Sequence, residues 1–228
     1  MSEATPEIKN LWHIVVAQPD SVFELRAIWP KGGACERQPK SKLFRADDYQ
    51  SLEARKEAVE ASALALNGDG YNVYIVMNPI RSCFEGGRSV TDNDIDRRSV
   101  LLVDIDRSGV HDEPATDSEV QSARDLADEV VRYLHPRGFT TPVRVDSGNG
   151  HHLYFPLENV GNTPESTKSI RMLLHRLADR FDNDVVKIDT SVYNASRITK
   201  VVGTVARKGA EGPARPYRVA KLYTERDE

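Results

Sequence analysis

The residues with the clearest chemical potential are two aspartates at the end of an apolar run, SVLLVDIDRSG at residues 99–109. Asp104 and Asp106 are separated by one residue, so in a strand both carboxylates leave on the same face. Neighbouring carboxylates repel each other unless a cation lies between them, and Mg²⁺ and Mn²⁺ prefer such oxygen ligands. The pattern predicts a divalent-metal site at the end of a buried strand. The alternative is a strand that runs out into a solvated acidic turn.

A glycine-rich turn, DSGNGHH at residues 146–152, is the second candidate site. Its central residues are two glycines and two short polar residues: Ser147, Gly148, Asn149 and Gly150. Glycines permit a tight turn whose backbone N–H groups can surround an anion. His152 begins the next strand and can donate to a phosphate oxygen, whereas His151 points to the other face. The alternative is an ordinary hairpin turn with a surface histidine.

The third candidate is the segment KIDTSVYNASRITKVVGT at residues 187–204. Asp189 directly follows an apolar residue and could supply a third carboxylate. Arg197 and Lys200 are three residues apart, so they lie on opposite faces of an extended segment but converge in a helical turn or a bulge. The alternative is an exposed basic loop.

The net charge of −4 by itself disfavours a nucleic-acid partner. The charge is unevenly distributed, however, because residues 197–221 hold seven basic residues and one acidic residue, Glu211. The basic ones are Arg197, Lys200, Arg207, Lys208, Arg215, Arg218 and Lys221. This local excess predicts a surface that contacts phosphates, and a merely solvated basic face is the alternative.

The elements that must position these residues belong to a chain of 228 residues, 39% apolar and 29% charged, which is long enough for a sizeable core. No apolar run approaches the about 20 residues that a membrane span requires, and the N-terminus has no signal-peptide pattern. The 2 cysteines are too few for a disulfide framework or a zinc cluster. The expected location is the cytoplasm, without a membrane partner.

The spacing of apolar residues predicts helices that alternate with strands and hairpins. Strands are expected at residues 21–30, 71–80 and 99–109, with a hairpin at 141–157. Helices are expected at residues 51–66, 118–134 and 164–181. Residues 81–98 are polar and contain glycine, which is typical of a loop. The order predicts an α+β sandwich with helices packed on a mostly antiparallel sheet.

Taken together and in this order, the three motifs resemble those of the archaeo-eukaryotic primase superfamily. They are an apolar strand into DxD, SGxGxH on a hairpin, and a hydrophobic residue and Asp followed by NxSRxxKxxGT. The resemblance is to the primase–polymerase branch of plasmids, phages and CRISPR-linked loci, and it covers most of the chain. It implies one catalytic domain over residues 1–228, with an N-terminal αβ half, about 1–98, and an RRM-like half, about 99–228. The implied fold is α+β, with largely antiparallel sheets flanked by helices.

Carried over by position, the resemblance implies that Asp104, Asp106 and Asp189 hold two Mg²⁺ or Mn²⁺ ions, with His152 as a further catalytic residue. It implies that the turn and the basic pair contact the nucleotide, through Ser147, Gly148, Asn149, Gly150, His152, Arg197 and Lys200. The basic segment would bind the strand through phosphate contacts that weaken with salt, from Arg207, Lys208, Arg215 and Arg218. The sequence departs from many relatives at Val202, where they have proline, and we expect this to alter only a local turn.

The function that this resemblance implies is template-directed nucleotidyl transfer by a DNA primase, a DNA polymerase or both. The expected partners are a single-stranded DNA template, a primer, and dNTP or NTP substrates. Relatives often carry a helical accessory domain or a helicase after the catalytic unit, and the sequence contains neither. Such a partner is therefore expected on another chain or in a part of the protein that this sequence lacks.

Three other functions are compatible with parts of the pattern. A haloacid-dehalogenase-type phosphatase also has an apolar run into DxD, but it favours Thr or Val where Ser108 stands and gives no role to SGNGHH. A Toprim nuclease or primase needs an upstream catalytic glutamate, for which Glu24 is a poor candidate. The non-enzymatic alternative is a replication or CRISPR accessory module that binds nucleic acid or nucleotides without turnover.

Overall fold

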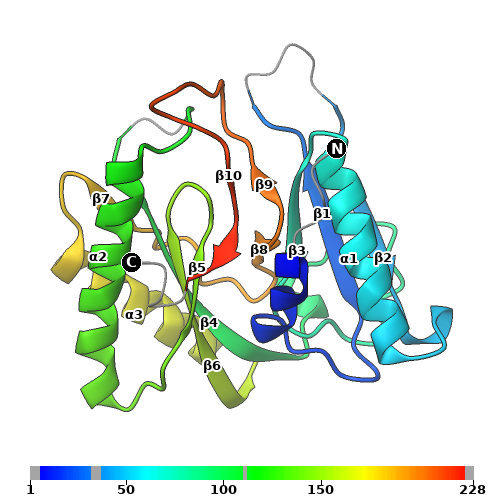
Figure 1. Cartoon of the computed structure of the whole chain (residues 1–228). Coiled ribbons are helices and arrows are strands. Elements are labelled where there is room, and N and C mark those ends of the chain that lie inside the picture. Colours follow the sequence, from blue (N-terminus) through cyan, green and yellow to red (C-terminus); the bar gives the residue numbers. More distant parts are fainter. Residues whose placement is uncertain (1–5, 32–36, 110–111, 224–228) are drawn as a thin grey trace.

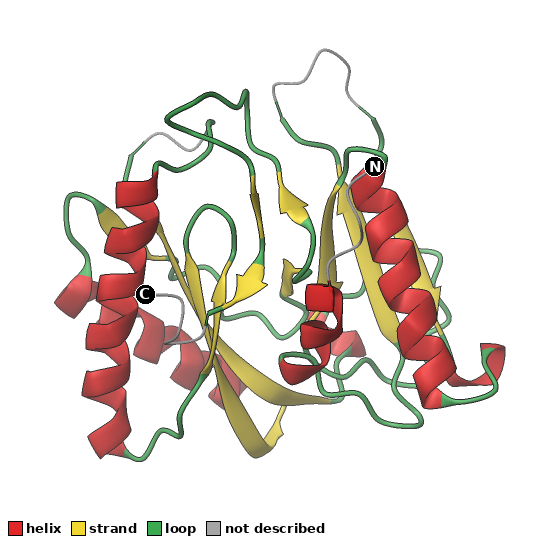
Figure 2. Ribbon diagram, in the orientation of Figure 1, coloured by secondary structure: helices red, strands yellow, loops and turns green. Residues whose placement is uncertain are grey.

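Two antiparallel sheets lie next to each other, and helices cover the outer face of each (Figures 1 and 2). This arrangement is seen in a computed structural model, which describes residues 6–31, 37–109 and 112–223. The predicted fold class is confirmed, because the chain is α+β with largely antiparallel sheets flanked by helices. No helix in these described ranges is long and apolar enough to cross a membrane.

The first sheet has the strand order β2-β1-β3-β8, and every neighbouring pair is antiparallel. Its strands are β1 (Phe23–Ile28), β2 (Lys40–Phe44), β3 (Asn72–Val76) and β8 (Ile198–Lys200). Helix α1 (Leu52–Gly68) packs on β1 and β3 and places Val59 and Ala63 in the core. The helix begins after Ser51, whose hydroxyl accepts a hydrogen bond from the Ala54 N–H at 3.1 Å.

The second sheet has the order β11-β5-β6-β4-β7, again with antiparallel neighbours. Its strands are β4 (Arg97–Arg107), β5 (Val143–Asp146), β6 (His151–Gly161), β7 (Val186–Ile188) and β11 (Lys221–Leu222). Helices α2 (Asp117–Leu134) and α3 (Pro164–Phe181) contact each other and pack on one face of this sheet. The order β4-α2-β5-β6-α3-β7 is the β-α-β-β-α-β arrangement expected of an RRM-like half. It leaves the other face of the sheet free of these helices.

Shorter elements join and cover the two sheets. A two-stranded sheet is formed by β9 (Val205–Ala206) and β10 (Arg218–Val219). Short 3₁₀ helices are η1 (Pro6–His13), η2 (Ala46–Asp48), η3 (Asp92–Asp94) and η4 (His135–Arg137). Strand β8 comes from the last part of the chain but pairs with β3, so sheet membership does not follow the order of the sequence.

Strand β4 is the buried strand that the apolar run predicts. Residues 100–103 and Ile105 are buried, and β4 pairs along its length with β6 and, at its end, with β7. Helices α2 and α3 lie within one residue of their predicted ends. Strand β2, KSKLF, has no counterpart in the sequence prediction, because it is an edge strand with three exposed polar residues and little apolar alternation.

Asn67, near the end of α1, joins the N-terminal half to β9. Its side-chain amide donates hydrogen bonds to Tyr71 O at 2.9 Å and Val205 O at 3.0 Å. Its carbonyl oxygen accepts the Val205 N–H at 2.9 Å. Asn67 is buried, so its removal would leave backbone polar groups without partners or water.

We expect Asn67→Ala to lower the free energy of unfolding by about 2 kcal/mol, because the lost side chain leaves buried backbone groups unsatisfied. Asn93→Ala is the matched control, since Asn93 is exposed. Chemical denaturation of both variants measures the difference. Equal stability of the two variants would contradict this role of Asn67.

Candidate active site

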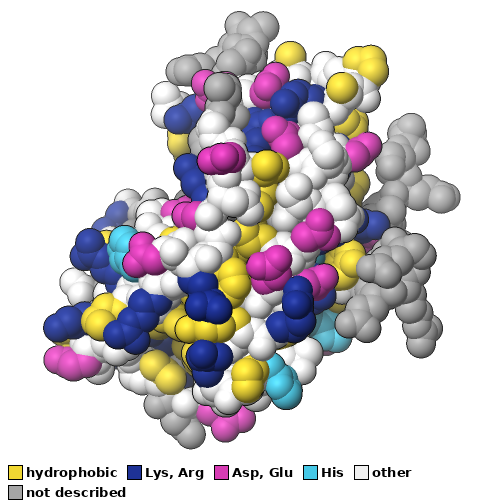
Figure 3. Space-filling view, turned by 90° about the vertical axis from the view of Figure 1, so that its left-hand side faces the viewer, with side chains coloured by type: hydrophobic (Ala, Val, Ile, Leu, Met, Phe, Trp, Pro, Cys, Tyr) yellow, Lys and Arg dark blue, Asp and Glu magenta, His cyan; other side chains and the backbone are white. Residues whose placement is uncertain are grey.

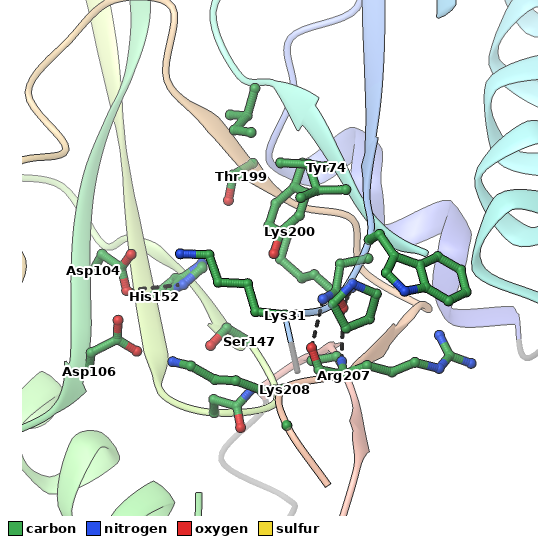
Figure 4. A pocket seen from close by; sticks show the side chains of 18 of the residues that line it. Lys31, Tyr74, Asp104, Asp106, Ser147, His152, Thr199, Lys200, Arg207 and Lys208 are labelled. Carbon is green, nitrogen blue, oxygen red and sulfur yellow. Dashed lines mark hydrogen bonds and ion pairs between the residues drawn. The ribbon is translucent and has the colours of Figure 1, made fainter. Parts of the chain in front are cut away.

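A cleft of about 420 Å³ lies between the two sheets and collects residues from both (Figure 4). The first sheet and its connections contribute Trp29, Lys31, Asn72, Tyr74, Thr199 and Lys200. The second sheet and its turn contribute Asp104, Asp106, Ser147, Asn149 and His152. Ala206, Arg207 and Lys208 come from β9 and the residues after it. Residues predicted from all three motifs therefore line one cavity.

The aspartates of β4 face this cleft from the open side of the second sheet. Ile105, between them, is fully buried, so the alternation of the strand directs Asp104 and Asp106 together to the opposite side. Asp104 Oδ1 is buried and has no hydrogen-bond partner among the described residues. His152 Nε2 lies 3.2 Å from this oxygen and forms an ion pair with it when the imidazole is protonated.

The pKa values of the two carboxylates are shifted in opposite directions. Burial, followed by the charge of Asp104, raises the pKa of Asp106 to about 6. Burial alone would also raise the pKa of Asp104, but His152, Arg197 and Lys208 together lower it. Two close carboxylates in a buried site cannot both be ionised without a compensating cation. The pair therefore fits a divalent cation in charge and in ligand type.

His152 is the second residue of β6 and lies opposite Asp104 in the antiparallel ladder. Its Nδ1 hydrogen-bonds to the Tyr154 hydroxyl at 2.8 Å, and that hydroxyl in turn bonds to Thr199 Oγ1 on β8. Burial by itself would lower the pKa of His152. The negative charges of Asp104 and Asp106 outweigh burial, so the net effect is a raised pKa. The imidazole is thus held between the carboxylates and the first sheet.

His151 points away from the cleft, as the alternation of β6 predicts. Its Nδ1 lies 2.9 Å from Asp146 Oδ1, and burial lowers the pKa of His151. Arg124 donates to both oxygens of Asp146 at 3.1 and 2.6 Å. His151 and His152 therefore serve different faces of the sheet.

The glycine-rich turn approaches the backbone of β4 more closely than a side chain would allow. A Cβ on Gly150 would lie 2.2 Å from Ile105 O and 3.0 Å from Asp106 Oδ1. Gly148 has a φ of +98°, and a Cβ there would lie 2.6 Å from the Ala206 Cβ. Within the turn, the Gly150 N–H donates to Ser147 Oγ at 3.1 Å. The two glycines thus seat the turn beside Asp106.

Two polar groups of the turn already form hydrogen bonds within the protein. The Ser147 N–H donates to Gly150 O at 3.0 Å, and Asn149 Oδ1 accepts the Ala115 N–H at 2.9 Å. Both Ser147 and Asn149 nevertheless line the cleft. Their contribution to ligand binding therefore depends on the atoms that these bonds leave available, such as the Asn149 amide nitrogen.

Asp189 directly follows β7 and is the backbone neighbour of Asp104, since its N–H donates to Asp104 O at 2.8 Å. Its carboxylate, however, lies 3.6 Å from Arg197 Nη2 and accepts the Ser191 N–H at 2.8 Å. Within the described ranges, no group of three or more His, Cys, Asp or Glu side chains is arranged to hold a metal ion. Asp189 is thus adjacent in the sheet, with its side chain turned to Arg197.

Lys200, on β8, is the most deeply buried of the basic residues that the motifs single out. Its ammonium donates to Val205 O at 2.9 Å and to Asn72 Oδ1 at 3.4 Å. Burial, followed by the charge of Arg207, lowers the pKa of Lys200 to about 7. Among the described residues no carboxylate forms an ion pair with it, so the cleft holds a buried amine without an anionic partner.

The basic segment divides into residues that line the cleft and residues with internal partners. Arg207 and Lys208 line the cleft, and Lys208 lowers the pKa values of both Asp104 and Asp106. Arg215 Nη1 lies 2.8 Å from Glu119, and Arg218 Nη2 lies 2.6 Å from Asp117. On the side of the molecule that carries α2, the coloured residues show basic and acidic side chains interspersed (Figure 3).

The cleft also contains residues that lie outside the three motifs, notably Lys31, Asn72 and Tyr74. Asn72 and Tyr74 are two apart on β3, and this polar alternation within an apolar strand is the one signal that could have indicated them. Burial, together with Asp104 and Asp106, raises the pKa of Tyr74 to about 12. Lys31 follows β1 in a stretch without a motif.

No family model and no curated protein matches this sequence. The chain is similar in structure to the AEP domain of the Cyanophage S-2L primase-polymerase, with a TM-score of 0.52 and 16% identity over 96% of this chain and 88% of that one. It is similar to the polymerase domain of Mycobacterium tuberculosis ligase D, solved in complex with DNA, with a TM-score of 0.53 and 15% identity over 96% and 80%.

A third similar structure is the primase RepB′, with a TM-score of 0.51 and 12% identity over 97% of this chain. This chain spans 56% of the RepB′ chain. All three similarities cover nearly the whole of the described protein, and they agree with the resemblance of the three motifs. The chain therefore has the fold of the archaeo-eukaryotic primase-polymerase domains over nearly its whole length.

Proposed function

We propose that this cleft carries out template-directed nucleotidyl transfer, joining nucleoside triphosphates on a single-stranded DNA template. The observation that carries the proposal is the convergence of Asp104, Asp106 and Lys200 in one cleft of a primase-polymerase fold. Carboxylates that suit a divalent cation and a cation that suits phosphate are the two components that phosphoryl transfer requires. The DNA complex of the ligase D polymerase domain supports DNA as the template.

Asp104 and Asp106 are the residues that would hold Mg²⁺ or Mn²⁺ in our proposal. The buried Asp104 Oδ1, which has the His152 imidazole 3.2 Å away, and the raised pKa of Asp106 support this assignment, because a bound cation would stabilise both carboxylates in their charged form. When bound, such ions activate the attacking hydroxyl and neutralise the triphosphate. His152, which lies 3.2 Å from Asp104 and is fixed by Tyr154, would orient that carboxylate, and its Nε2–H would turn to a phosphate oxygen once a cation is bound to Asp104.

Asp189 is proposed as the third carboxylate of a two-ion site. Its backbone bond to Asp104 supports this role, and its side chain would have to exchange Arg197 for the cation. Arg197 would then be released to a phosphate of the nucleotide or strand. One exchange thus supplies both a metal ligand and a phosphate contact.

Lys200 and Lys208 are proposed to bind the phosphates of the incoming nucleotide, with the Ser147–Gly150 turn beside them. Lys200 supports this because it is a buried amine without a carboxylate partner among the described residues, and a bound phosphate would favour its protonated form. Arg207, which lines the cleft, is proposed to contact the strand. Arg215 and Arg218 would contribute to the strand only by leaving their carboxylates on α2.

Two of the alternative functions can be compared with contacts in the structure. Glu24 of β1 accepts hydrogen bonds from Ser41, Arg26 and the Val90 N–H, which suits a structural role rather than that of a Toprim base. A module that binds nucleotides or nucleic acid without turnover is favoured by one observation, the pairing of Asp189 with Arg197. Incorporation assays separate this second candidate from the polymerase.

We expect Asp104→Asn to lower primer extension by about a thousandfold or more, because one neutral amide cannot replace a metal-binding carboxylate. The assay uses purified protein, a primed single-stranded template, labelled dNTPs and Mn²⁺ or Mg²⁺. Asp179→Asn, at an exposed position of α3, is the control and should retain extension. Extension that survives Asp104→Asn would refute the assignment. Nucleotide binding without any incorporation by the unaltered protein would favour the binding module.

The lowered pKa of Lys200 predicts a pH dependence of nucleotide binding. Between about 7 and 10.5 the buried amine is neutral in the free protein, so phosphate binding must take up a proton and weakens as pH rises. We expect the Kd to rise by up to about tenfold per pH unit between pH 8 and 9.5. Lys200→Met should bind more weakly but with a flat profile over that interval. Identical slopes for both proteins in calorimetry would contradict the prediction.

A further inference from the structure

Lys31, which follows β1, is a basic residue of the cleft that none of the three motifs contains. It lines the same cavity as Asp104, Asp106 and His152, although those residues belong to the other sheet. In Figure 4 its side chain points into the cavity, with the ammonium end directed toward the wall that carries Asp104 and His152. The first sheet therefore presents a cation to the acidic wall of the second.

The backbone just before Lys31 is well anchored. The Trp29 ring packs edge-on against the Tyr71 ring at 5.0 Å, and the Arg37 guanidinium lies 4.4 Å from the Trp29 ring centre. Pro30, between Trp29 and Lys31, restricts the backbone further. These contacts hold the chain that leads into Lys31 at the rim of the cleft, and the Lys31 side chain extends from there into the cavity (Figure 4).

The other basic side chains of β1 and β2 have partners of their own. Arg26 forms an ion pair with Glu24 at 2.9 Å. Lys42 donates a hydrogen bond to Ser62 Oγ at 2.9 Å, and the Lys40 ammonium lies 4.7 Å from the centre of the Tyr71 ring. Lys31, by contrast, forms no hydrogen bond or ion pair with any residue that the structure describes. It is exposed and directed into the cleft, which leaves its charge available to an anionic ligand.

We propose that Lys31 binds the phosphate chain of the nucleoside triphosphate from the side of the first sheet. This inference rests on the proposed function and adds a contact that the motifs do not supply. A triphosphate beside Asp104 and Asp106 brings further negative charge to an already acidic wall, so cations on several sides are required. Lys200 and Lys208 reach the cavity from β8 and from the residues after β9, and Lys31 reaches it from the connection after β1.

The direction of the side chain favours the nucleotide over the template strand as its partner. In Figure 4 the ammonium ends of Lys31 and Lys208 both lie toward the aspartate wall, where the reacting phosphates would be held. Lysine supplies a mobile point charge that suits a phosphate chain. Nucleotide binding would then join residues of the two sheets through one ligand.

The test compares Lys31→Gln, Lys31→Arg and the control Lys42→Gln, whose side chain donates to Ser62. Calorimetry with Mg²⁺ and a non-hydrolysable deoxynucleoside triphosphate measures the Kd. We expect Lys31→Gln to bind about tenfold more weakly, because one charge-assisted phosphate contact is lost. Lys31→Arg should stay within about threefold of the unaltered protein, and Lys42→Gln should match it. The loss should shrink at high salt, since the contact is electrostatic.

The outcomes separate this inference from the proposed function. If the unaltered protein binds no nucleoside triphosphate, both fail. If it binds and Lys31→Gln binds equally well, only the role of Lys31 is overturned. Fluorescence anisotropy with single-stranded DNA, without nucleotide, gives the second readout, and we expect Lys31→Gln to change it by less than about twofold. Weakened DNA binding with unchanged nucleotide binding would assign Lys31 to the strand and overturn the proposal.

Discussion

The repulsion between Asp104 and Asp106 is the physical constraint around which the cleft is arranged. Strand β4 fixes the spacing of their backbones, because it is paired on both sides there and residues 98–103, Ile105 and Arg107 are buried. Burial and the charge of Asp104 hold the pKa of Asp106 at about 6. Around them His152, Arg197 and Lys208 supply positive charge, and Asp104 Oδ1 still lacks a hydrogen-bond partner among the described residues. A divalent cation is the ligand that best satisfies such a pair.

The two sheets form one site because polar contacts cross between them. The His152 imidazole on β6 reaches Thr199 on β8 through the Tyr154 hydroxyl. Strand β8 is itself a late segment of the chain that pairs with β3, so it brings Lys200 to the first sheet. The ammonium of Lys200 then bonds to Val205 O, which fixes the start of the segment that carries Lys208. The residues proposed as metal ligands and phosphate contacts are therefore positioned by a single connected network.

The sequence predicts those parts of the molecule that depend on local patterns. The apolar run of β4, the period of α2 and α3, and the glycines of the hairpin turn are properties of neighbouring residues, and the structure agrees with each. Strand β2 is missed because an edge strand needs only one apolar face. The rotation of the Asp189 side chain toward Arg197 is not predictable from spacing, because the bond joins a strand end to a loop. The available ligand set thus depends on tertiary contacts that the motifs do not encode.

Only some of the basic residues that cluster in the sequence line the cleft in the structure. The excess of basic residues between Arg197 and Lys221 is real, but Arg215 and Arg218 meet Glu119 and Asp117 at the start of α2. An ion pair that is already formed offers a phosphate little net attraction, since the carboxylate must first be displaced. The cations that line the cleft instead come from segments far apart in the sequence, with Lys31 at one end and Lys208 at the other. Because the fold alone brings them together, the positive charge that lines the cleft is a property of the folded chain and not of any one basic stretch.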